Sequence, residues 1–181
     1  MLNHLSVASL FAGHDSNRWH ETRITPNKSS VKCSQLIEKL EKNINNPKLK
    51  RNDNIWNYGY IFHFIKQSNK FSPDTINLEV LHSDLRGKVK AMAKAIIDTC
   101  KLNKFQPSYM KPFRKIVGID AASSEIDCRP EVFAHAFRYI LKLDKNMGGT
   151  YHVGEDFYDL ADGLRAIDEC ILFMNFHRGI V

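Results

Sequence analysis

The sequence has no long apolar run, and none of its stretches approaches the roughly 20 consecutive apolar residues that a bilayer-spanning helix needs. The mildly apolar stretch 5–13 is not preceded by Lys or Arg, as a secretory signal peptide would require. The four cysteines are widely spaced without a C-x-x-C pair, which argues against a disulfide scaffold or a cysteine zinc knuckle. We therefore expect a soluble cytoplasmic protein with reduced thiols and no membrane contact.

Several common catalytic motifs are also missing. There is no Walker A loop, no G-x-G-x-x-G and no G-x-S-x-G elbow, which argues against P-loop NTPases, kinases, Rossmann dehydrogenases and ordinary serine hydrolases. The eight histidines form neither H-x-H nor H-E-x-x-H, and the H-x-E with P-C-x-x-C of cytidine deaminases is absent. The sequence therefore contains no self-contained zinc motif.

The composition is that of a folded protein: 181 residues with 43% hydrophobic residues can build a core, and one domain is the natural expectation. The net charge of +6 points only weakly to anionic partners. The basic residues are dispersed, whereas nucleic-acid binders concentrate them on one face with aromatic platforms. A soluble basic protein is favoured, and a nucleic-acid-binding module is kept open on net charge alone.

Periodic patterns predict an alternation of helices and strands, although residues before Ser30 show no sustained period. Apolar residues spaced three and four apart predict helices over 30–45, 83–100, 130–146 and 160–172. Nearly continuous β-branched and aromatic runs predict strands over 55–65 and 113–120. The segment 150–156 completes the alternation but is too short and polar to be a strand by pattern alone. This order predicts βα units around a parallel sheet in residues 55–181, after a helical and irregular segment 1–54.

Polar residues gather where two of these strands end. One cluster is Gly118–Glu125, and the other is His152-Val153-Gly154-Glu155. The C-terminal ends of parallel strands face the active site, where an imidazole can hold a metal and a carboxylate beyond a glycine can turn toward the same point. By pattern alone, a chance pairing of His and Glu remains the alternative.

The two clusters resemble the adenosine deaminase branch of the metal-dependent amidohydrolases. The family signature H-A-G-E is similar to His152–Glu155, and its G-I-D-L-A-G-x-E run is similar to Gly118–Glu125. The strings GIDAASSEIDCRPEVFAHAFRYI and TYHVGEDFYDLADGLRAIDE look closest to the large bacterial adenosine deaminase-like proteins of antiviral defence. The resemblance covers about residues 113–178.

This resemblance implies a (β/α)8 TIM barrel, of which the chain would carry roughly strands three to five. It also implies a zinc-dependent hydrolase that releases ammonia from C6 of adenine in adenosine or an adenine nucleotide. His152 would bind Zn²⁺, and Glu155 would be the catalytic proton shuttle. The substrate pocket would be lined by Asp120, Ala121, Ala122, Ser123 and Gly154. The family glycine that approaches the substrate corresponds to Ser123 in this chain.

The family's other metal ligands, an H-x-H on the first strand, a later His and a later Asp, have no counterpart here. We therefore expect a partial sequence that is inactive alone. The alternative is a non-catalytic scaffold subunit of the same fold in a homo-oligomer or defence complex. Among other candidates, His63 is expected to be a satisfied core histidine, and Asp156 or Asp159 is expected to cap the last helix rather than bind metal.

Overall fold

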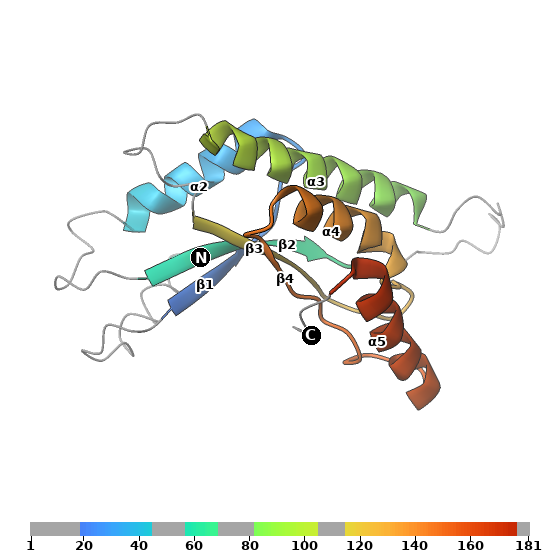
Figure 1. Cartoon of the computed structure of the whole chain (residues 1–181). Coiled ribbons are helices and arrows are strands. Elements are labelled where there is room, and N and C mark those ends of the chain that lie inside the picture. Colours follow the sequence, from blue (N-terminus) through green and yellow to red (C-terminus); the bar gives the residue numbers. More distant parts are fainter. Residues whose placement is uncertain (1–18, 45–56, 69–81, 105–114, 177–181) are drawn as a thin grey trace.

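The computed structural model describes residues 19–44, 57–68, 82–104 and 115–176, and the features below refer to these residues. They form a parallel sheet of four strands and four helices (Figure 1). The strands are β1 (Trp19–Ile24), β2 (Asn57–Ile65), β3 (Ile116–Ala122) and β4 (Gly148–Gly149). The helices are α2 (Ser30–Ile44), α3 (Ser83–Lys104), α4 (Glu131–Leu143) and α5 (Leu160–Met174). The expected parallel α/β architecture is confirmed.

The strands lie in the sheet in their chain order, β1-β2-β3-β4, and every neighbouring pair is parallel. In the register of the sheet, Arg23 on β1 lies opposite Ile61, and His63 on β2 lies opposite Asp120. Backbone pairing continues beyond β4, where the His152 N–H donates to the Ala121 carbonyl at 2.9 Å. The carboxyl ends of β2, β3 and this extension of β4 therefore lie together at one end of the sheet, which we call the strand edge.

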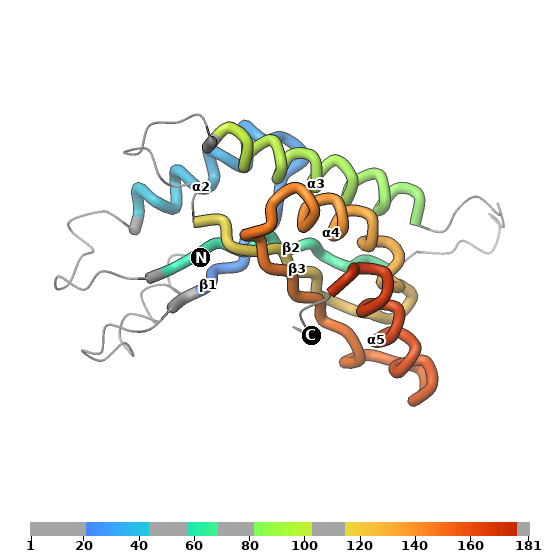
Figure 2. Tube along the Cα trace, in the orientation of Figure 1, coloured from blue at the N-terminus to red at the C-terminus, as the bar shows by residue number. Residues whose placement is uncertain are grey.

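The helices follow the strands in sequence order across the molecule. Contacts join α2 to α3, α3 to α4 and α4 to α5. Figure 1 shows α2, α3 and α4 together over the sheet, with α5 beyond β4, and Figure 2 shows the chain passing through them in turn. This sequential order differs from a doubly wound sheet, in which the strand order reverses and helices cover both faces.

The core lies between the sheet and the helices. Alternate residues of β2 point into it, namely Tyr58, Tyr60, Phe62 and Phe64. Phe137 of α4 is fully buried at the centre, with ring centroids 6.0 Å from Phe64, 5.7 Å from Tyr151 and 6.0 Å from Phe176. These aromatic contacts join β2, α4 and the segments on both sides of α5.

The N-terminal segment contributes a strand that the sequence analysis did not predict. β1 pairs with β2, and Ile24 and Ile37 belong to the same buried cluster as the β2 aromatics. The sheet and core therefore include residues on both sides of position 54. The strand was missed because its sequence, WHETRI, is mostly polar and has no regular alternation of apolar residues.

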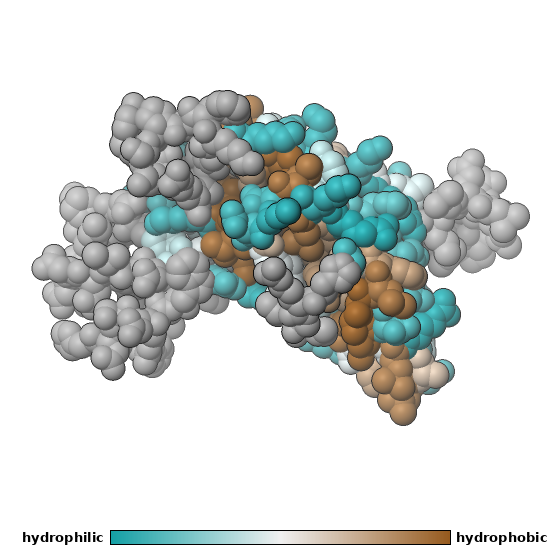
Figure 3. All heavy atoms as spheres, in the orientation of Figure 1, coloured by the Kyte–Doolittle hydropathy of each residue, from teal (hydrophilic) through white to brown (hydrophobic). Residues whose placement is uncertain are grey.

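The helices lie close to the predicted positions, but α5 buries a different face from the one that its apolar residues indicate. α3 begins at Ser83 as expected, and Asp159 caps α5 by accepting the Asp162 N–H at 2.8 Å. Most of the apolar residues whose spacing predicts α5 are exposed rather than buried, with Leu160 at 70% and Leu164 at 59%. Figure 3 shows this apolar surface in brown where α5 lies. α5 packs through its other side because α4 is its main helical neighbour.

Of the helices that the structure describes, none combines the length and the apolar character needed to cross a membrane.

Candidate functional site

A group of polar side chains lies on the sheet face opposite the helices. We call Arg23, His63, Asp120 and His152 the Asp120 cluster. Asp120 and His63 belong to this face because residues along a strand alternate between faces and Phe62, Phe64 and Ala121 point into the helix-side core. The cluster therefore combines side chains from four successive segments of the sheet.

The Asp120 carboxylate is the centre of this cluster and its side chain is fully buried. Its Oδ2 accepts from Arg23 Nε at 2.8 Å and lies 3.1 Å from His63 Nδ1. Its Oδ1 lies 3.3 Å from His152 Nδ1. One carboxylate thus joins an arginine and two imidazoles.

The protonation of the cluster follows from these contacts. Burial by itself would raise the pKa of Asp120, but hydrogen bonds from Arg23 and His63 outweigh it and hold that pKa below its usual range. An ionised carboxylate only accepts hydrogen bonds, so each imidazole Nδ1 that bonds to it must carry a proton. In neutral His63 and His152, Nε2 is then the nitrogen with a free lone pair.

His152 and Glu155 are three residues apart, and Gly154 lies between them with φ +83°. A Cβ at Gly154 would also lie 2.9 Å from the Ile167 side chain. The glycine therefore permits both the turn and the close packing on α5. Glu155 is exposed, while the His152 side chain is 34% exposed.

The other predicted pocket residues separate by sheet face. Ala122 follows the parity of Asp120 and is partly buried. Ala121 is fully buried in the core on the helix side, so only its backbone lies near the strand edge. Asp120, Ala122 and His152 are thus brought to one region, whereas the Ala121 side chain is not.

Ser123 has φ +91°, a backbone conformation that favours glycine. The backbone of this chain is therefore strained at Ser123, the position that corresponds to a glycine in the adenosine deaminase family.

Replacing Ser123 by glycine is expected to raise the free energy of unfolding by about 1 kcal/mol, since relief of strain exceeds the extra flexibility of glycine in the unfolded chain. Urea unfolding of the full chain measures it. The matched control is Ser124→Gly at an exposed neighbour that is not among the positive-φ residues, and there we expect a loss of about 0.5 kcal/mol. Equal losses at both positions would contradict the strain at Ser123.

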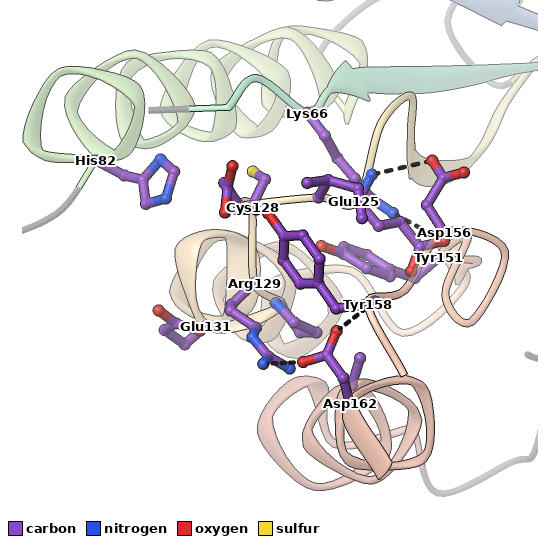
Figure 4. Close-up of a pocket in the computed structure, with 14 residues that line it drawn as sticks. Lys66, His82, Glu125, Cys128, Arg129, Glu131, Tyr151, Asp156, Tyr158 and Asp162 are labelled. Carbon is purple, nitrogen blue, oxygen red and sulfur yellow. Dashed lines mark hydrogen bonds and ion pairs between the residues drawn. The ribbon is translucent and has the colours of Figure 1, made fainter. Parts of the chain in front are cut away.

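A cavity of about 310 Å³ lies on the helix side of the same strand edge (Figure 4). It is lined by Lys66, Glu125, Cys128 and Tyr151, together with residues in or next to the first turns of α3, α4 and α5. Burial raises the pKa of the Cys128 thiol, which argues against a reactive thiolate in this cavity. Among the described residues, none of the predicted site residues lines it.

Two residues of this region, Arg23 and His63, were not predicted from the sequence to contribute to it. Arg23 lies on the unpredicted strand β1 and therefore had no place in a sheet pattern. His63 was expected in the core, and the structure instead places it in the Asp120 cluster, with its side chain 21% exposed. Its alternation with Phe62 and Phe64 is the signal that could have placed it opposite the core.

Comparison of the sequence with protein-family models and with curated proteins finds no match.

Proposed function

We propose that the chain is part of an adenosine deaminase-like, zinc-dependent hydrolase, in which His152 is a zinc ligand and Glu155 is the proton shuttle. The observation that carries this proposal is the contact between His152 Nδ1 and Asp120 Oδ1 at 3.3 Å. Metal-binding histidines usually donate their second ring N–H to a carboxylate, which fixes the tautomer and the ring orientation. When His152 Nδ1–H donates to Asp120 in this way, the lone pair of Nε2 is the one that can bind a metal ion.

The sheet supports the same proposal at the level of the fold. Parallel strands in chain order, each followed by a helix on one side, are the arrangement of consecutive units in a (β/α)8 barrel. We propose that β1 to β4 are four such units. The Asp120 cluster would then face the interior of the barrel, at the edge where such enzymes bind substrates.

Among the described residues, His152 is the ligand that we propose for a zinc site. Within 19–44, 57–68, 82–104 and 115–176, no group of three or more His, Cys, Asp or Glu side chains is placed to hold a metal ion. A catalytic zinc usually has three protein ligands. The proposal therefore assigns the remaining ligands to residues outside these ranges or to another chain.

The residues of this chain have separable tasks in the proposed reaction. Bound zinc would supply a hydroxide nucleophile at neutral pH for attack on C6 of adenine. Asp120 orients the His152 ring, and Arg23 keeps Asp120 ionised so that it acts only as an acceptor. Glu155 would donate a proton to the purine ring nitrogen as hydroxide adds to C6, before ammonia leaves.

The test introduces Glu155→Gln and His152→Ala into the complete protein that contains this chain, with adenosine and AMP as substrates. Glu155→Gln is expected to lower kcat about 100-fold or more with zinc content unchanged, because it removes the acid and no ligand. His152→Ala is expected to weaken zinc binding by about 100-fold or more. Ammonia release and metal analysis measure these effects, with Asp168→Asn on the exposed face of α5 as the control.

Unchanged turnover in Glu155→Gln would reject the proton-shuttle role. The scaffold alternative would replace the enzyme if the complete protein that contains this chain binds no zinc, releases no ammonia and assembles into a homo-oligomer or defence complex. Retention on DNA or RNA that weakens with salt would instead support the nucleic-acid-binding alternative.

A further inference from the structure

A buried ion pair lies just beyond the ends of β2 and β3. The Lys66 side chain is fully buried and the Glu125 side chain is 7% exposed, with Nζ and Oε1 3.7 Å apart. Figure 4 shows the two side chains meeting at the edge of the cavity, above the Tyr151 ring. The Lys66 ammonium lies 4.5 Å from the centre of that ring. Residues from three separate segments thus converge on one point.

Both members of the pair bind the backbone of the segment 152–155. The Lys66 ammonium donates to the His152 carbonyl. The Glu125 carboxylate accepts from the Gly154 N–H at 2.8 Å through Oε2 and from the Glu155 N–H at 3.2 Å through Oε1. The pair therefore holds the backbone on both sides of Val153.

These contacts specify the position of the segment more than they stabilise the fold. Hydrogen bonds with one ionised partner are about twice as strong as neutral ones, so two of them on adjacent N–H groups fix the local backbone. A buried ion pair, in contrast, adds little stability beyond what apolar residues of the same size provide. Since the pair is costly to bury, its benefit lies in the single backbone conformation that it selects.

We propose that Lys66 and Glu125 are positioning residues that hold the backbone of 152–155, so that the His152 ring and the Glu155 carboxyl face the same point. The functional part of this inference rests on the proposed deaminase activity, because it assigns those two side chains a shared task. Neither Lys66 nor Glu125 need touch the substrate, since both lie on the helix side of the sheet edge.

The experiment compares the complete zinc-loaded protein that contains this chain with its Glu125→Gln variant. A carboxamide has one acceptor oxygen for two N–H groups, so the Gly154 and Glu155 amides are expected to exchange with solvent about 10-fold faster or more. Amides of α4 are expected to change less. With adenosine as the probe, kcat is expected to fall about 30-fold while KM stays within about threefold, because the ligand set is intact and the acid is misplaced.

The double variant Lys66→Met/Glu125→Leu separates positioning from stability. Glu125→Gln leaves the Lys66 charge buried without its partner and is expected to lower the urea midpoint. The double variant removes both charges, so its urea midpoint is expected to lie closer to the wild-type value. In the double variant the Gly154 and Glu155 amides are expected to exchange as fast as in Glu125→Gln, and kcat is expected to be equally low. Glu131→Gln is the matched control, because Glu131 is an acid at the same edge that pairs with Arg86 and does not contact the segment.

Wild-type exchange rates at Gly154 and Glu155 in Glu125→Gln would overturn the inference. Fast exchange with unchanged kcat would overturn the functional part of it, as would recovery of kcat together with stability in the double variant. If the complete wild-type protein that contains this chain releases no ammonia, the proposed function fails, and the exchange rates alone then decide whether the pair holds the segment.

Discussion

Replacing Asp120 by asparagine is expected to lower the free energy of unfolding by about 2–3 kcal/mol. The carboxylate is fully buried and joins Arg23, His63 and His152 through its two oxygens. The carboxamide has no charge and one acceptor oxygen for these three groups, and its NH2 group faces a donor in place of the second oxygen. Breaking a fully buried pair costs about 3–5 kcal/mol, and the effect is smaller here because Arg23 is 46% exposed and screened by water. Urea unfolding of the full chain measures it.

The control is Asp98→Asn, which removes an exposed i,i+4 pair with Lys94 and is expected to change stability by about 0.5 kcal/mol or less. The pH dependence gives a second check. Because the pKa of Asp120 is lower in the folded state, its contribution is complete above the ordinary value of about 3.9 and is lost as the pH falls through the folded value. The difference between wild type and variant should therefore shrink as the pH falls below about 4. A difference that does not shrink there would show that the pKa of Asp120 is not lowered in the folded state.

Replacing Phe137 by alanine is expected to lower the free energy of unfolding by about 3–5 kcal/mol. The side chain is fully buried and contacts Phe64, Tyr151 and Phe176, which belong to three different segments. Truncation removes this apolar burial and leaves a cavity that the surrounding rings can fill only in part. Equilibrium unfolding in urea, followed by circular dichroism, measures the loss.

Phe137→Leu retains most of the volume and keeps the measurement possible if the alanine variant does not fold. Tyr139→Ala is the matched control on the same helix, because Tyr139 is 45% exposed, and we expect a loss below about 1 kcal/mol. Comparable losses at positions 137 and 139 would contradict the placement of the core.

The sequence predicted the elements whose own pattern is strong. β2 is nearly continuous in aromatic and β-branched residues, and α4 carries an uninterrupted apolar stripe, so both were placed close to their observed positions. The start of α3 was placed at Ser83 or Asp84, because either residue can cap the regular apolar face that follows, and the helix begins at Ser83. In these cases local pattern and tertiary packing require the same residues.

β1 and the exposed face of α5 show where local pattern is insufficient. In β1, Arg23 is directed to Asp120, which is 97 positions away in the sequence, so no local period could reveal its role. In α5, the apolar residues have the spacing of a core face, yet Leu160 and Leu164 are exposed. Periodicity shows that a helix has an apolar side and not what covers it.

The candidate site was predictable in its strand-end residues and not in the contacts that connect them. His152, Asp120 and Glu155 were selected by their place after strands and by the resemblance. Lys66 was not selected, although it continues the alternation of Phe62 and Phe64 onto the buried side. Its role depends on the carbonyl that it meets beyond β4, which only the folded chain brings within reach.

The strand order also constrains how the chain can reach its native structure. Every pair of neighbouring strands is parallel and separated by a helix, so no two strands can form a hairpin. The chain must close loops of dozens of residues before the first ladder can form, and the entropy of closure is lost before the contacts repay it. We therefore expect local helix formation to precede sheet assembly, and the strands, with Asp120 among them, to form late in folding.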